Sequence, residues 1–262
     1  MKYFQKTFRP DIIDGAIAKV IGSDGGDAPF ASGDILFDWQ AIDIPLGTDA
    51  IVDALVHMYG EDGGSQANDD FNLLIAKSNN GVAPTTLGNE NGQLSGCFEL
   101  PDVLIGIMKF EADSNRVGKL NLGGHGGSIY HFNVTGNNGH VGPVVIEPEH
   151  NALGGQTTNR IYVAGISGGE FDFSTGVLLN NGSNVADDST TTLDVDGVDP
   201  RKAFRVGDTV YKHNSNTPIG TIASLTVNTI VLTSNNVGGV DDDEEFMNAK
   251  PITVTLGFKG RG

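Results

Sequence analysis

The segment Ile252-Thr253-Val254-Thr255-Leu256-Gly257-Phe258-Lys259 alternates large apolar residues with small or polar ones. A period of two places the apolar side chains on one face of an extended strand. Short apolar segments recur along the chain between clusters of Gly, Asn and Asp, and 37 of the 262 residues are glycine. This pattern is typical of β-sandwiches and barrels, so the sequence predicts an all-β protein.

Other segments predict further strands. In residues 35–41 the odd-numbered positions are Ile, Phe, Trp and Ala, which puts the large apolar groups on one face. Residues 71–76 and 103–110 are apolar on both faces, as expected of central strands that are covered on both sides. Residues 129–134 and 160–166 also have the composition of strands.

Two segments have helical spacing. In residues 13–21 the apolar residues recur every three or four positions, although Gly15 weakens this interpretation. Residues 51–58 fit a helix and a strand equally well, so periodicity leaves both alternatives open there.

The composition changes after about residue 168. Residues 180–192 are rich in Asn, Ser, Asp and Thr, which indicates a loop or linker. We therefore expect two domains, residues 1–168 and 169–262, with the boundary around Gly168–Gly169. The first is predicted to be a jelly-roll-like β-sandwich.

The second domain has the segment order of a small SH3-like barrel. Residues 204–211 enter a strand through a tight Gly-Asp turn, and a hairpin is expected at residues 214–218. Two short strands rich in β-branched residues follow at 219–224 and 229–233. An acidic loop at 241–245 then precedes the final strand.

Within this region the sequence resembles virion structural proteins of tailed phages, most closely those that decorate or cement the capsid. The resemblance lies in Phe173–Val177, Val206–Tyr211, Ile219–Ile222 and Ile230–Thr233. It implies a binding module without chemistry that forms a homo-oligomer, often a trimer. It also implies a location on the capsid exterior, with the major capsid protein or another virion protein as partner.

The charge of the chain excludes some partners. The sequence has 16 Lys and Arg against 33 Asp and Glu, a formal net charge of −17, and no basic residue lies between Lys19 and Lys77. Such a surface repels nucleic-acid phosphates and anionic lipid headgroups, so neither nucleic acid nor a membrane is expected as a partner. No signal peptide is expected in residues 1–10, and no apolar run is long enough to span a bilayer.

Cys97 is the single cysteine, which rules out an intrachain disulfide. Its neighbours are apolar and include no activating base, so we expect a small core residue. Two glycosylation sequons, Asn133–Thr135 and Asn181–Ser183, carry little weight without a secretory signal.

No metal site is predicted. His125, His131, His140 and His150 are separated by gaps of six, nine and ten residues, unlike the short spacings of zinc ligands. Residues 194–199 (DVDGVD) fail as an EF-hand because glycine comes at the fourth position and the twelfth is Arg205. A calcium turn of another kind stays open there, although Asp and Gly also build ordinary turns.

No catalytic or cofactor site is predicted either. The glycine clusters at 22–26 and 123–127 lack the Gly-Lys-Ser/Thr of a phosphate-binding loop. Two pairs of acids, Glu147 with Glu149 and Asp69 with Asp70, are expected by chance in so acidic a chain. A Gly-x-Ser-x-Gly elbow is missing as well. We therefore expect no enzyme activity and no cofactor.

Four functions compete at this stage. The first is a capsid decoration protein that binds the outside of a phage head and stabilises it. The second is a tail, baseplate or fibre component of the virion. The third is a carbohydrate-binding module, which the scarcity of Trp disfavours because sugars stack on exposed aromatic rings. An enzyme comes fourth.

Overall fold

The computed structural model confirms that the protein is all-β. The structure describes residues 2–12, 30–59, 70–79, 81–111, 117–121, 127–133, 143–146, 158–171, 173, 178–180, 183–212 and 218–260. The helix expected at 13–21 and the hairpin tip expected at 214–217 lie outside these residues. In the described part no helix is long and apolar enough to cross a membrane.

Six described strands form one large antiparallel sheet. Its strand order is β1 (Lys2–Phe8), β16 (Ile252–Gly260), β3 (Thr48–Met58), β7 (Ser128–Asn133) and β6 (Val117–Asn121), with β8 (Val144–Val145) also paired to β3. The segment with two open interpretations, residues 51–58, is therefore a strand. It hydrogen-bonds to β16 on one side and to β7 on the other.

A second antiparallel sheet packs against the first. Its order is β2 (Ile35–Pro45), β9 (Thr158–Ser167), β4 (Phe71–Ala76) and β5 (Leu104–Phe110). The prediction for β4 is confirmed: Phe71, Leu73 and Ile75 face the core between the sheets, while Leu74 and Ala76 pack in a smaller core on the opposite face.

Two details of this sheet differ from the prediction. The segment 103–110 contains an edge strand, because β5 pairs with β4 alone among the described strands and Ile107 is 52% exposed. Along β2 the expected alternation is interrupted by register shifts between residues 35 and 40, which bury Leu36 as well as Phe37. A β-bulge resets which side chains face the core, and periodicity alone does not reveal it.

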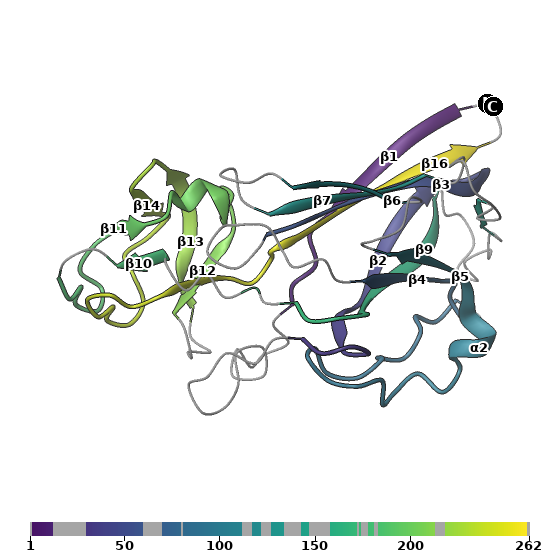
Figure 1. Ribbon diagram of the computed structural model, residues 1–262, viewed down its shortest axis with the longest axis horizontal. Helices are drawn as coiled ribbons and strands as arrows, with labels where there is room; N and C mark the ends of the chain where they lie inside the picture. Colours follow the sequence, from purple (N-terminus) through teal and green to yellow (C-terminus); the bar gives the residue numbers. More distant parts are fainter. Residues whose placement is uncertain are drawn as a thin grey trace.

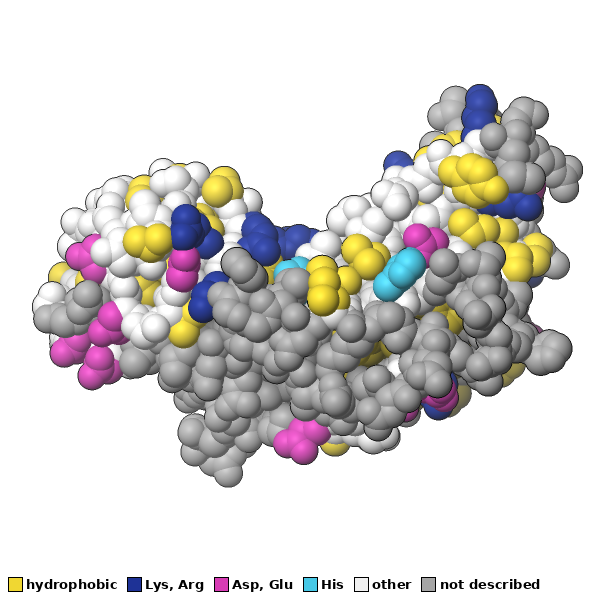
Figure 2. Space-filling view, turned by 45° about the horizontal axis from the view of Figure 1, so that its top comes forward, with side chains coloured by type: hydrophobic (Ala, Val, Ile, Leu, Met, Phe, Trp, Pro, Cys, Tyr) yellow, Lys and Arg dark blue, Asp and Glu magenta, His cyan; other side chains and the backbone are white. Residues whose placement is uncertain are grey.

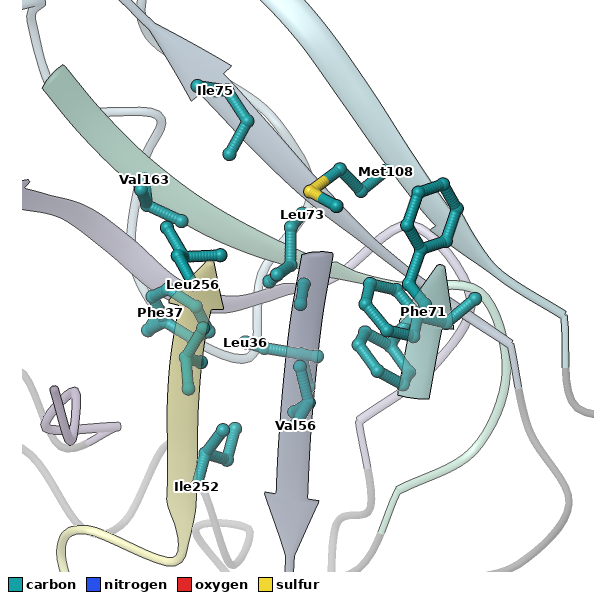
Figure 3. Close-up of a cluster of buried hydrophobic side chains, with 14 of the residues drawn as sticks. Leu36, Phe37, Val56, Phe71, Leu73, Ile75, Met108, Val163, Ile252 and Leu256 are labelled. Carbon is teal, nitrogen blue, oxygen red and sulfur yellow. The ribbon is translucent and has the colours of Figure 1, made fainter. Parts of the chain in front are cut away.

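Side chains from both sheets interdigitate to form the main core (Figure 3). Phe71 stacks on Phe110 with ring centroids 4.3 Å apart, and Tyr130 of β7 meets Phe71 edge-on at 5.1 Å. Figure 3 labels ten of the core residues: Leu36, Phe37, Val56, Phe71, Leu73, Ile75, Met108, Val163, Ile252 and Leu256.

The third sheet builds a separate lobe, drawn on the left of Figure 1. Its order is β10 (Leu178–Asn180), β11 (Thr192–Gly197), β14 (Thr229–Leu232), β13 (Pro218–Leu225), β12 (Thr209–Lys212) and β15 (Phe246–Asn248), and a 3-10 helix, η3, spans Pro200–Lys202. The Gly-Asp turn is confirmed: Gly207 has a φ of +89°, and Asp208 N donates to Arg205 O. This lobe has its own apolar core around Phe204 and Phe246.

The final strand does not belong to the small lobe. We expected residues 252–259 to complete the barrel, but β16 returns to the large sheet and lies between β1 and β3 (Figure 1). Phe171 and Phe173 also pack in the main core, although they follow the expected boundary at 168. The residues of the main core and of the small lobe's core are therefore not separated at residue 168, the boundary expected between residues 1–168 and 169–262. How many units fold independently stays a prediction.

Candidate interaction surface

The structure places one of the four clustered histidines. His131 lies on β7, and its Nε2 is 2.7 Å from Asp53 Oδ1 on β3. This contact follows from strand register, because Leu55 lies opposite His131 and Asp53 is two residues away on the same strand. His125, His140 and His150 lie outside the described residues.

The acidic motif at 194–199 is divided between a strand and a helix cap. Asp194 and Asp196 are exposed on β11, on the face opposite the buried Leu193. Asp199 precedes η3, where its carboxylate accepts hydrogen bonds from the backbone N and the guanidinium of Arg201. The hydrogen bond from the Arg201 side chain lowers the pKa of Asp199. The Asp199 carboxylate therefore forms an ion pair with the Arg201 guanidinium of the same chain.

The other predicted positions are only partly described. Gly127 has a φ of +82° and leads into β7, where an added Cβ would lie 2.2 Å from Met58 O. Asp70 precedes β4, while Asp69, Glu147, Glu149 and the glycines at 22–26 and 123–126 lie outside the described residues. Within the described ranges, no three His, Cys, Asp or Glu side chains are grouped so that they could hold a metal ion.

Cys97 is a core residue, as expected. It packs in the smaller core on the outer face of the second sheet, and burial raises the pKa of its thiol. The chain around it forms a long irregular loop between β4 and the short helix α2 (Leu100–Val103), and this loop covers that face of the sheet.

Side-chain hydrogen bonds hold this loop in place. Glu99 accepts from Thr85 N and Thr85 Oγ1, each at 2.8 Å, which lowers the pKa of the Glu99 carboxyl. Trp39 Nε1 donates to Thr85 O at 2.9 Å, and Leu87 N donates to Asp38 Oδ1 at 3.1 Å. These two side-chain bonds fasten the loop to β2, and backbone bonds between Ile35 and residues 91 and 92 do so as well.

Phe98 projects from this loop into solvent. Its side chain is 94% exposed although its neighbour Cys97 is buried. Single exposed apolar residues are ordinary, but a large ring held in solvent by a hydrogen-bonded backbone is the kind of side chain that anchors protein interfaces.

A second surface feature lies at β1, the edge strand of the large sheet. Lys2, Lys6 and Arg9 make this end of the chain basic, and residues 1–10 contain no acid. Phe4 stacks on Phe258 with ring centroids 5.0 Å apart, while Tyr3 is 67% exposed.

Two hollows adjoin β1 and share Tyr3 and Phe4. The larger has a volume of about 520 Å³ and lies between β1 and the turn from β2 to β3; its lining residues are Lys2, Tyr3, Phe4, Pro45, Leu46, Gly47, Thr48 and Gly260. The smaller has a volume of about 400 Å³ and is lined by Tyr3, Phe4, Gln5, Val52, Asp53, Gly257 and Phe258.

Sequence reasoning missed both features. Phenylalanine is usually a core residue, so the sequence does not mark Phe98 as exposed. The backbone at Cys97, where φ is +51°, turns the ring outward. The hollow at β1 joins residues that are far apart in sequence. One signal was available: the first ten residues are basic in a strongly acidic chain.

The described residues form an all-β protein with an exposed phenylalanine ring on one surface and two hollows beside β1. Comparison with protein-family models, with curated proteins and with solved structures finds no match.

Proposed function

We propose that the protein is a structural component of a virus particle, a decoration or cement protein that binds the outer surface of a phage head and stabilises it. The supporting observation is that most of the segments that carry the resemblance lie together. The turn at Gly207 leads into β12, and β12, β13 and β14 are neighbours in one sheet. We interpret this lobe as the small SH3-like barrel and the two packed sheets as the jelly-roll-like sandwich.

The small lobe offers a surface for docking on a basic shell. Asp187, Asp188 and the acidic loop Asp241–Asp243 are exposed, and acidic side chains gather at the outer end of this lobe in Figure 2. Hydrogen bonds hold these residues in place: Asp242 N donates to Asn184 Oδ1 at 2.9 Å, and the Asp187 carboxylate accepts from Gly238 N at 2.7 Å. Fixed carboxylates attract a complementary basic surface and repel an acidic one.

Binding of this kind stabilises a shell by mass action, because the protein binds the assembled lattice better than separated subunits. We propose a symmetric oligomer, a trimer, as the binding form. Interaction at a shell junction then occurs at several equivalent points, which raises the overall affinity above that of one contact.

The test compares particles with and without this chain. We expect added density on the outer surface, many copies per particle and genome release at a higher temperature. The variant with Asp241, Asp242 and Asp243 all changed to Asn should bind less, while the control with Asp194 and Asp196 changed to Asn should bind normally. A few copies confined to the tail would support the tail alternative and overturn this proposal.

No specific observation favours carbohydrate binding. Tyr3 and Phe98 are the exposed aromatic side chains of the described residues. Tyr3 belongs to the large sheet, and Phe98 belongs to the loop that covers the other sheet. A stacking platform for sugars requires aromatic rings on one surface.

A further inference from the structure

The loop around Phe98 holds the ring in a defined position. Cys97 has a φ of +51°, its side chain is buried, and its carbonyl accepts a hydrogen bond from Leu100 N at 2.9 Å. Gly96 N donates to Leu87 O at 2.8 Å, and an added Cβ at Gly96 would lie 2.2 Å from Thr86 O. The backbone on both sides of Phe98 is therefore closely packed and already ordered. Little backbone entropy is lost when the Phe98 ring binds a partner.

The sequence next to Phe98 is acidic. Glu99 and Asp102 follow the ring within four residues, and residues 78–108 contain no Lys or Arg. Asp102 is exposed in α2, close in sequence to the ring. A partner surface should therefore combine an apolar hollow with positive charge.

The larger hollow at β1 has both properties. Its lining includes the residues Tyr3, Phe4, Pro45 and Leu46, and its volume is enough for an aromatic side chain. Leu46 is 53% exposed. Lys2 lines the hollow, and Lys259 is paired with Tyr3 across the β1–β16 ladder.

We propose that Phe98 of one copy of the chain inserts into this hollow of a second copy, with Lys2 and Lys259 facing the acidic surroundings of the ring. The two surfaces lie on different layers of one molecule. The loop before α2 covers the second sheet, whereas the hollow adjoins β1, the edge strand of the first sheet. Figure 1 shows α2 and β1 in these separate layers. The contact joins unlike surfaces, so repetition closes a ring when the rotation between copies permits.

This inference deepens the proposed function, because it names the contact that would build the oligomer. The two can fail separately. A protein that binds shells as a monomer would overturn the contact between copies but leave the proposal of shell binding. An oligomer that forms through this contact but does not bind shells would support the contact and overturn shell binding.

The first experiment measures self-association of the purified full chain by sedimentation velocity. We expect concentration-dependent oligomers, and Phe98→Ser or Leu46→Asp should weaken association at least about tenfold. Val82→Ser is the matched control, because Val82 is 67% exposed in the same loop. All three sites are exposed, and unchanged thermal unfolding will show that each variant folds.

The second experiment mixes the two defective variants. The Phe98→Ser variant still has an intact hollow, and the Leu46→Asp variant still has the Phe98 ring. A ring from the second variant can therefore enter a hollow of the first. The mixture should form a one-to-one dimer although each variant alone is monomeric. A mixture that stays monomeric would contradict the contact.

The third experiment locates the contact. With p-benzoylphenylalanine at position 98, illumination should cross-link two copies, and the linked peptide should contain residues 2–4 or 45–48. Cross-links to other segments of the chain would overturn the proposal, as would a wild-type protein that is monomeric up to about 100 µM.

Discussion

Arg9 and Asp208 form an ion pair that joins the end of β1 to the turn before β12. The Asp208 side chain is 4% exposed, and its other carboxylate oxygen accepts from Arg205 N at 2.7 Å and from Asn248 Nδ2 at 3.0 Å. Arg9 Nη2 also donates to Lys250 O. This carboxylate therefore links the N-terminal strand to the small lobe.

Asp208→Asn should lower the free energy of unfolding by about 3–5 kcal/mol, because it leaves the Arg9 guanidinium without its counter-charge in a partly buried site. Urea denaturation measures the loss, and a double-mutant cycle with Arg9→Met measures the coupling. The exposed pair Arg160 with Asp43 is the control: Asp43→Asn should cost less than about 1 kcal/mol. Equal losses at the two pairs would contradict this account.

Asn236→Ala should destabilise the small lobe and open the segment 183–192 to proteases. The buried Asn236 amide uses its whole bonding capacity: Oδ1 accepts from Ser189 N and Thr190 N, and Nδ2 donates to Ala186 O and Gly238 O. Each buried group left without a partner costs about 1–3 kcal/mol.

The measurements for Asn236→Ala are urea denaturation and limited proteolysis. Asn235→Ala is the neighbouring control, because Asn235 is exposed and makes a single side-chain bond, to Asp188 O. The segment was expected to be a linker, so rapid cleavage there in the wild-type protein would show that Asn236 does not hold it.

Gly165→Ala should destabilise the main core by about 1–3 kcal/mol through overpacking. A Cβ at this position of β9 would lie 2.4 Å from Cε1 of the buried Phe37 ring on β2. Phe37→Leu makes room, so the double variant should lose less stability than the sum of the single losses in thermal unfolding. Additive losses would show that the two sites do not interfere.

Stability should fall at alkaline pH partly because of Tyr59. Burial raises the pKa of this phenol above its usual 10, and the Arg205 guanidinium lies 5.0 Å from the ring centroid. A raised folded-state pKa gives stability that is complete below pH 10 and is lost as the pH rises through the folded-state value.

Tyr59→Phe keeps the ring and removes this titration. Between pH 10 and 12 its unfolding free energy should therefore fall less steeply than that of the wild type, by up to about 1.4 kcal/mol per pH unit. Urea denaturation across this range measures both slopes. Identical slopes would show that Tyr59 does not contribute.

Local chemistry was enough to predict much of the strand content. Alternation in residues 252–259 and the doubly apolar run at 71–76 both correspond to strands, and Gly207-Asp208 forms the expected turn. Cys97 was assigned to the core from its neighbours alone. These features depend on the residues within one segment, so the sequence carries them directly.

Only the tertiary structure determined which strands and side chains distant in sequence lie side by side. A period of two determines which side chains of β16 share a face, but it does not say that β1 and β3 lie beside this strand. The edge position of β5, the pairing of Arg9 with Asp208 and the hollow at β1 depend on the same long-range order. Phe98 illustrates the limit most clearly: composition assigns a phenylalanine to the core, and only the packed loop around Cys97 turns its ring into solvent.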